Sequence, residues 1–309
     1  MSRLLSRAVG AACALCAGVA MAADAPAHPT MGEVLAAAKP SDWRALDPDN
    51  TLYLQLASGR VVIELAPQFA PQTVANIKTL VREKYFDGLA ILRVQDNYVA
   101  QWGDPDAEDS ARRRPLGKAK AKIPAEFSIT PGKDFVFTPL PDVDGWAPQT
   151  GFAGDFPAAV DLQAHQAWLT HCYGTLGVGR DVAADSGNGA ELYVSIASSA
   201  RWLDRNITVA GRVVQGMEYL SSLPRGHGEL GFYTRNEHPV RIDSVRLAAD
   251  LPEKQRAHLQ VLRTDTSTFA ALVESRRNRR DEWYKHPAGH IDVCSVPLPV
   301  RETGAGTTK

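Results

Sequence analysis

The stretch YFDGLAILRVQDNYVAQWGDP, residues 85–105, decides the fold of this chain. It contains two short apolar runs, residues 89–94 and 98–101, which we predict to be neighbouring β-strands. Each run carries one polar side chain, Arg93 in the first and Gln101 in the second. Because burying an unpaired charge is costly, an arginine within an apolar run needs a partner or a function.

Composition places the chain among ordinary globular proteins. Of its 309 residues, 44% are hydrophobic and 22% are charged, which are typical values for a packed domain. The length permits one large domain or two small ones. The net charge of -1 provides no overall field for nucleic acid or an anionic membrane. We therefore expect neither as a partner, and we expect a monomer.

The N-terminus has the pattern of a secretory signal peptide. Arg3 and Arg7 precede an apolar run over residues 8–19, and Ala20-Met21-Ala22 matches a cleavage site. We predict that residues 1–22 are removed by a cut after Ala22, and that the protein is periplasmic or secreted. The run is too short to span a bilayer comfortably, and no later stretch approaches transmembrane length.

Cysteine usage agrees with export. Four cysteines are present, and the predicted cleavage leaves two, Cys172 and Cys294. An even number in an oxidising compartment favours one disulfide. That bond would tie the C-terminal tail to the body of the domain, whereas the alternative is two buried thiols.

The central part of the chain has the periodicity of β-strands with a few helices. Residues 52–56 and 61–65 alternate as a hairpin, and a helix begins near Pro71 with an apolar stripe. Further strands are predicted near residues 176–179, 191–196, 208–214 and 240–247, and a short helix over 216–223. About eight short strands with two or three helices predict a closed β-barrel with helices over its ends.

The remaining segments are expected to surround that barrel. Residues 23–50 are predicted as a linker and short helices, with a capping box at Thr30 and Glu33. Residues 251–309 are predicted as a C-terminal extension with a helix around Phe269 and an apolar tail across the surface. Residues 104–170 are predicted as an irregular insertion. Its acidic run followed by a basic run favours a solvated loop over a partner site.

At this point the chain resembles a known family. From Leu52 to Leu247 it is similar to the cyclophilins, the peptidyl-prolyl cis-trans isomerases. The matching blocks, in family order, are Ala70-Pro71-Gln72-Thr73-Val74-Ala75-Asn76, Tyr85-Phe86-Asp87-Gly88, Ile91-Leu92-Arg93-Val94, Gln101-Trp102-Gly103-Asp104-Pro105, Asn188-Gly189-Ala190-Glu191-Leu192-Tyr193-Val194, Trp202-Leu203-Asp204 and Ala210-Gly211-Arg212-Val213-Val214-Gln215-Gly216-Met217. The resemblance implies a closed eight-stranded antiparallel barrel capped by two helices, over about residues 51–250.

The resemblance also implies a site and an activity. Arg93 would be the catalytic residue, donating a hydrogen bond toward the proline nitrogen of an X-Pro bond, and Gln101 would orient it. The implied substrate-binding residues are Tyr98, Val99, Gly179, Arg180, Glu191, Tyr193, Trp202, Leu203 and Ile207. No cofactor and no metal are implied. The expected partners are proline-containing segments of exported proteins, whose folding the enzyme would assist.

Several residues depart from the family pattern and leave alternatives open. Leu92 replaces a histidine and Glu191 a glutamine, so Arg93 could instead form a structural ion pair with Glu191. Tyr98 and Tyr193 could be simple core aromatics. A non-catalytic chaperone or assembly factor that binds proline-containing peptides on the same barrel is the alternative function. A metal site built from His165, His171 and Cys172 fits no recognised zinc spacing.

Overall fold

A computed structural model describes residues 29–279 and 283–303. The predicted signal peptide, its cut after Ala22 and most of the predicted linker lie outside the described residues. None of the helices in the described ranges is both long enough and apolar enough to cross a membrane.

The predicted eight-stranded antiparallel barrel is confirmed, with the strand order β13-β2-β3-β12-β10-β11-β5-β4. The strands are β2 Thr51–Leu56, β3 Gly59–Leu65, β4 Ala90–Gln95, β5 Val99–Gly103, β10 Thr175–Val178, β11 Leu192–Ser195, β12 Val209–Gln215 and β13 Ile242–Leu247. Backbone hydrogen bonds join the two outermost strands. The Gly88 N–H donates to the Ile242 carbonyl over 2.9 Å, and the Ile91 N–H donates to the Val240 carbonyl over 2.8 Å. These bonds, at the ends of β4 and β13, nearly close the sheet into a barrel.

Two helices contribute to the barrel core. Helix α2 spans Pro71–Arg82, with proline at its first position as the sequence predicts. The Glu126 carboxylate accepts hydrogen bonds from the Gln72 and Thr73 N–H groups at 3.0 and 2.9 Å, so it satisfies the otherwise unpaired helix start. The second helix, α3, spans Met217–Ser221 and buries Leu220 in the same core.

The prediction that residues 104–170 are irregular is wrong for the second half of that segment. A four-stranded antiparallel sheet occupies it, in the order β6-β7-β8-β9. Its strands are β6 Thr138–Pro139, β7 Gln149–Ala153, β8 Phe156–Asp161 and β9 Gln166–Leu169. The alternation that identifies strands is not apparent in this segment, because two of the strands contain proline. A turn at Gly154, whose φ is +58°, also interrupts it.

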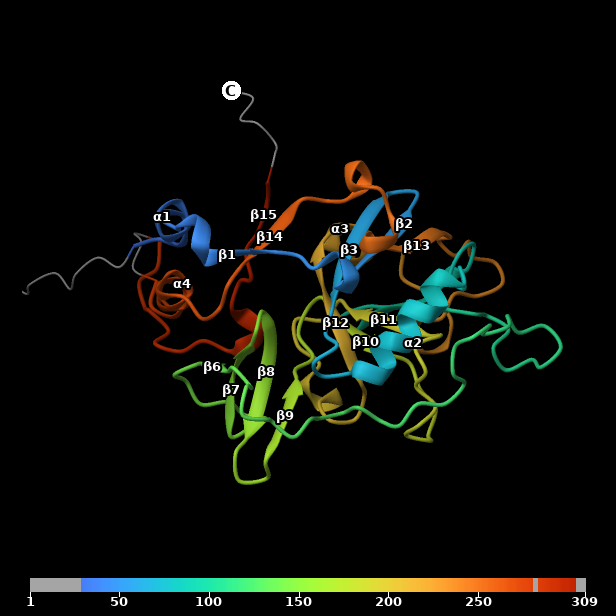
Figure 1. The fold of residues 1–309 in the computed structure, drawn as a ribbon, viewed down its shortest axis with the longest axis horizontal. Helices are drawn as coiled ribbons and strands as arrows, with labels where there is room; N and C mark the ends of the chain where they lie inside the picture. Colours follow the sequence, from blue (N-terminus) through green and yellow to red (C-terminus); the bar gives the residue numbers. More distant parts are fainter. Residues whose placement is uncertain (1–28, 280–282, 304–309) are drawn as a thin grey trace, which may run out of the picture.

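The N- and C-terminal segments meet in one extension. Helix α1 (Met31–Ala36) lies beside α4 (Ser267–Arg277), next to the β6–β9 sheet (Figure 1). The capping box of Thr30 and Glu33 is confirmed. A three-stranded sheet of β1 (Trp43–Ala45), β14 (Leu259–Leu262) and β15 (Val300–Glu302) completes the extension, with β14 in the middle. Single-turn 3₁₀ helices occur at Pro40–Asp42, Pro48–Asn50, Arg201–Leu203, Glu229–Gly231, Ala248–Asp250, Glu253–Gln255 and Val293–Ser295.

The C-terminal tail lies against the body of the protein with three buried apolar side chains, while residues 285–290 are exposed. Ile291, Val293 and Val296 pack in one apolar cluster with residues of α1 and α4. Packing against the apolar face of α4 removes these side chains from water. A disulfide joins Cys172 to Cys294 in this tail, with the two Cα atoms 4.9 Å apart. The tail is thus fixed to the body of the protein.

The extension also covers one outer face of the barrel. Leu259 and Val261 of β14 pack against Tyr53, Val62 and Val214 of strands β2, β3 and β12. Both faces of these strands are therefore buried. The extension leaves the outer face of the four consecutive strands β10, β11, β5 and β4 for a site.

Candidate functional site

A β-bulge turns Arg93 to the outside of the barrel. Ile91 pairs with Trp102 and Arg93 with Gln101, so Leu92 is an extra residue in β4. Ile91 and Trp102 both lie in the barrel core. Strict alternation would place Arg93 on the same face as Ile91, whereas the extra residue reverses the face. Arg93 and Gln101 consequently lie side by side on the outer face.

Three hydrogen bonds hold the Arg93 guanidinium. Its Nη1 donates to Gln101 Oε1 at 3.1 Å, its Nη2 donates to Gln95 Oε1, and its Nε donates to the Leu230 carbonyl at 2.6 Å. All three acceptors are neutral. Burial lowers the pKa of Arg93, and the opposing influence of Tyr98 and Glu191 is smaller. No carboxylate of the described residues contacts the guanidinium to neutralise its charge.

Gln101 lies between Arg93 and Glu191. Its side chain accepts from Arg93 and donates to Glu191 Oε1. Within the described parts of the chain, Arg93 has no acidic side chain within ion-pair distance, so the ion pair with Glu191 considered above is not present. Burial raises the pKa of Glu191, and the hydrogen bond from Gln101 opposes that shift only in part.

Aromatic side chains flank the arginine. The Tyr98 ring centroid lies 5.2 Å from Arg93 Cζ, and the Phe232 centroid lies 5.4 Å from it. Tyr98 also stacks with Trp202, with ring centroids 6.1 Å apart. Trp202 is half exposed, next to the half-buried Leu203 on the same helical turn. These rings surround an apolar surface beside Arg93.

Tyr193 lies on the same outer face, paired with Gln101 in the ladder. Its ring packs over Gly177, where even a Cβ atom would lie 2.1 Å from the Tyr193 ring. The Tyr193 hydroxyl contacts His171 Nε2 at 3.0 Å, and His171 Nδ1 contacts Asp204 at 3.0 Å. Because a carboxylate only accepts, Nδ1 of a neutral His171 carries the proton and Nε2 accepts from Tyr193. Tyr193 is therefore more than a core aromatic.

A buried ionic group supports that histidine. Arg201 donates to Asp204 at 2.5 Å and to both carboxylate oxygens of Asp144 at 3.0 and 3.1 Å. Burial alone raises the pKa of Asp204, but the hydrogen bond from His171 and the charge of Arg201 outweigh it and hold that pKa below its ordinary value. His171 thus has a structural partner on each ring nitrogen.

The remaining predicted residues are placed next to Glu191 or along the same face. Gly179 donates its N–H to the Glu191 carbonyl at 2.9 Å. The Arg180 guanidinium donates to the Asn206 carbonyl at 2.9 Å, immediately before the half-buried Ile207. Val99 is buried and pairs with Gln95, on the same outer face.

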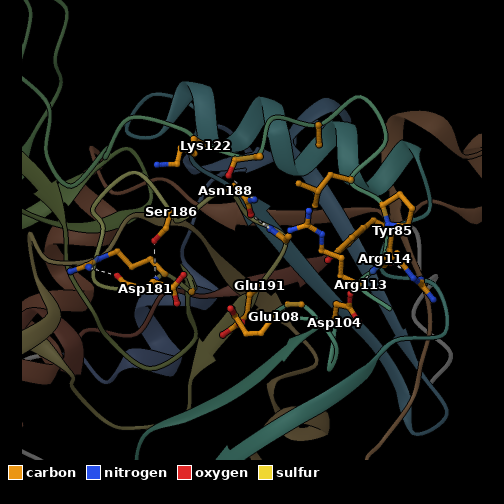
Figure 2. Close-up of a pocket in the computed structure, with 18 of the residues that line it drawn as sticks. Tyr85, Asp104, Glu108, Arg113, Arg114, Lys122, Asp181, Ser186, Asn188 and Glu191 are labelled. Carbon is orange, nitrogen blue, oxygen red and sulfur yellow. Dashed lines mark hydrogen bonds between the residues drawn. The ribbon is translucent and has the colours of Figure 1, made fainter. Parts of the chain in front are cut away.

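A pocket of about 730 Å³ opens beside Glu191 and is lined also by Gly179 and Arg180. Its other wall is the charged loop of residues 104–122, which includes Glu108, Arg113 and Lys122. Figure 2 shows Glu108 and Glu191 close together within it. The charge run that we interpreted as a solvated loop therefore also forms a pocket wall. In the described ranges, no group of three or more His, Cys, Asp or Glu side chains could hold a metal ion.

Comparison with known proteins decides the family. A model of the cyclophilin type peptidyl-prolyl cis-trans isomerases matches residues 51–247. The chain belongs to the cyclophilins. A probable peptidyl-prolyl cis-trans isomerase of Brucella suis is 30% identical over 212 residues, covering 67% of this chain and 86% of that protein. The human peptidyl-prolyl cis-trans isomerase-like 1 is 26% identical over 218 residues, covering 71% and 99%.

Structural similarity extends beyond the cyclophilin domain itself. The crystal structure of the cyclophilin AquaCyp293 from Hirschia baltica is similar, with a TM-score of 0.68 and 29% identity. The alignment covers 88% of this chain and 97% of the AquaCyp293 chain. That share exceeds the span of the family match, so part of the flanking segments aligns as well.

The sequence alone did not predict the contacts of four residues in this site, although Asp204 belongs to a family block and His171 was considered as a metal ligand. Leu230 and Phe232 contact Arg93 from a loop 137 positions away in the chain. Asp204 and His171 support Tyr193 from outside the barrel strands. Only the Tyr193 hydroxyl, which needs a partner when buried, could have suggested such a neighbour.

Proposed function

We propose that Arg93 is the catalytic residue of this cyclophilin and that its substrates are X-Pro bonds of exported proteins. The single observation that supports this role most strongly is the set of partners around Arg93. Neutral oxygens hold three of its five N–H groups. Two N–H groups have no acceptor among the described residues and remain for a substrate.

Catalysis of prolyl isomerisation requires little chemistry but accurate positioning. Amide resonance creates a barrier of about 18–20 kcal/mol, and rotation becomes easier when the proline nitrogen loses conjugation. A guanidinium N–H can donate to that nitrogen only in the twisted state. Such a contact is stronger in the transition state than in either planar isomer, and this difference lowers the barrier.

The surface beside Arg93 would bind the proline ring. Tyr98 and Trp202 would supply the accessible aromatic area, with Leu203 at the edge. Val99 and Tyr193 lie on the same outer face but are almost fully buried. Three hydrogen bonds fix the Arg93 side chain, so it cannot move toward a bound peptide. The peptide must therefore bind with its X-Pro amide next to the guanidinium. The apolar surface would fix that approach.

The site is tested by measuring cis-trans exchange in a proline-containing tetrapeptide by NMR. We expect Arg93→Ala to lower kcat/KM at least about 100-fold, the size typical for loss of a charge-stabilising donor. Arg263→Ala is the matched control, because Arg263 pairs with Asp265 in the extension and should leave exchange unchanged. Full activity of Arg93→Ala would refute the role. Binding of unfolded client without any acceleration by the wild type would favour the non-catalytic chaperone.

The exported substrates follow from the N-terminal sequence. A basic start, an apolar run and Ala20-Met21-Ala22 direct a chain to the secretory pathway, and the Cys172–Cys294 disulfide suits an oxidising compartment. Slow prolyl isomerisation limits folding there as elsewhere. Intact mass measurement of the protein recovered from the periplasm or medium should show loss of residues 1–22. Retention of these residues would contradict export by this signal.

A further inference from the structure

A loop after helix α3 runs along the edge of strand β4, at the position of Arg93. The Gly226 N–H donates to the Val94 carbonyl at 3.0 Å, and the Tyr233 N–H donates to the Leu92 carbonyl at 2.9 Å. The loop is thus attached to the residues on both sides of Arg93. We call residues 226–233 the Arg93 clamp.

Two groups of the clamp contact the guanidinium directly. Leu230 has a φ of +54°, a left-handed conformation that non-glycine residues rarely adopt. Its carbonyl accepts from Arg93 Nε at 2.6 Å. The Phe232 ring lies in cation–π range of the same guanidinium. Uncommon backbone geometry beside a reactive side chain points to a function that requires it.

The clamp is built for close approach. Gly231 has a φ of +80°, and a Cβ on it would lie 2.7 Å from Gln95 Cα. A Cβ on Gly226 would lie 2.2 Å from the Gly231 carbonyl oxygen. Only glycine permits the loop to lie this close to β4.

We propose that the Arg93 clamp is a positioning element for isomerisation. The Leu230 carbonyl and the Phe232 ring fix the guanidinium plane, so that the two remaining N–H groups of Arg93 face the substrate. The inference rests on the catalytic role proposed for Arg93 and adds to it what keeps that side chain in place. Without the clamp, Gln101 and Gln95 would still hold the two Nη atoms, but Nε would lose its acceptor and the guanidinium would lose the Phe232 ring.

The exposure of the clamp makes the proposal testable. Leu230 and Phe232 are 59% and 41% exposed, so neither side chain belongs to the barrel core. A change at Phe232 should therefore leave folding intact, as thermal unfolding can verify.

The first experiment separates the aromatic ring from its apolar bulk. NMR exchange and peptide binding are measured for Phe232→Leu, Phe232→Tyr and the control Leu162→Ala, an exposed apolar residue of the β8–β9 turn. We expect Phe232→Leu to lower kcat about threefold, the effect of one exposed cation–π contact, while the peptide Kd changes little. Phe232→Tyr should retain the wild-type kcat. A fall in binding with unchanged kcat, or a faster Phe232→Leu enzyme, would overturn the positioning role.

The second experiment moves the whole clamp. Gly231→Ala forces the loop away from Gln95 without altering Arg93, and we expect about a tenfold lower kcat from the misplaced donor. Arg93→Ala is measured in parallel. If Arg93→Ala is inactive while Gly231→Ala and Phe232→Leu behave as wild type, the clamp inference fails and the role of Arg93 stands. If Arg93→Ala is active, the proposed role of Arg93 itself fails.

Discussion

Two arginines beside the same barrel face have opposite environments. Arg201 is buried and contacts the carboxylates of Asp144 and Asp204. Burial alone lowers the pKa of Arg201, but its two acidic partners outweigh burial and raise it. Arg93 is only partly buried and contacts two amide oxygens and a backbone carbonyl, and its pKa is lowered.

The difference separates a structural arginine from one suited to catalysis. The single positive charge of Arg201 is already neutralised by Asp144 and Asp204, so a substrate amide could gain little from it. Arg93 is held in a fixed position without being neutralised, which leaves its charge for a transition state. The chemical class of the partners, acidic or neutral, distinguishes the two roles better than the depth of burial.

The largest expected effect comes from removing the buried arginine. Arg201→Leu leaves Asp144 and Asp204 without their cation, and we expect a loss of about 3–5 kcal/mol in the free energy of unfolding. Urea denaturation measures it. The control Arg82→Leu removes an exposed pair with Asp250 and should cost at most about 1 kcal/mol. Equal losses in the two variants would mean that Arg201 contributes no more to stability than an exposed arginine, and would contradict its structural role.

A second change makes Arg93 resemble Arg201. Gln101→Glu places a carboxylate against the Arg93 guanidinium, and we expect kcat/KM for a proline peptide to fall about tenfold, equal to about 1.4 kcal/mol. Gln101→Asn keeps a neutral amide and should lose less. Greater activity in the carboxylate variant than in Gln101→Asn would show that neutral partners are not what Arg93 requires.

A smaller effect is expected at the junction between the two arginines. Tyr193→Phe removes the hydroxyl and leaves His171 Nε2 buried without a partner. This should reduce stability by about 1 kcal/mol, the lower end of the cost of an unsatisfied buried polar group, because the ring itself is kept. The double variant with His171→Leu tests the coupling, since removing both partners should cost less than the sum of the single losses. Strict additivity would mean that the hydroxyl and the imidazole do not interact.

The smallest effect is a pH dependence of stability from Asp204. Its folded-state pKa is lowered, so its stabilisation is present above the unfolded pKa of about 3.9 and is lost as pH falls through the folded value. The difference in unfolding free energy between wild type and Asp204→Asn should shrink as pH falls from about 6 toward 3. A difference that stays constant over this range would exclude the Asp204 contribution.

The barrel could be predicted from the sequence because its hairpin and its first long helix are strongly periodic. The stripe of α2 reports burial directly. The alternation of residues 52–56 marks the face in the barrel core, whereas the extension buries Tyr53 on the other face. The β6–β9 sheet could not be predicted, since proline within two of its strands obscures the period. The outward direction of Arg93 depends on a bulge at Leu92. A bulge within a continuous apolar run cannot be recognised from the sequence.

The site was predictable only where its residues are close in sequence or match family blocks. Arg93 and Gln101 are eight residues apart and pair across one ladder. Phe232 reaches Arg93 through a loop without periodicity, so its place follows from tertiary structure alone. His171 was considered as a metal ligand, but its ring nitrogens are occupied by Tyr193 and Asp204.

The sheet of the extension has a consequence for the order in which the protein assembles. Among the strands of the described residues, β1 near the N-terminus pairs only with β14, which is more than 200 residues further along the chain. During synthesis the N-terminal part emerges first, yet β1 has no partner strand until residues 259–262 follow. The barrel strands are all present once residue 247 has emerged. The part of the chain made first is therefore among the last to find its partner strand, after every strand of the barrel has been synthesised.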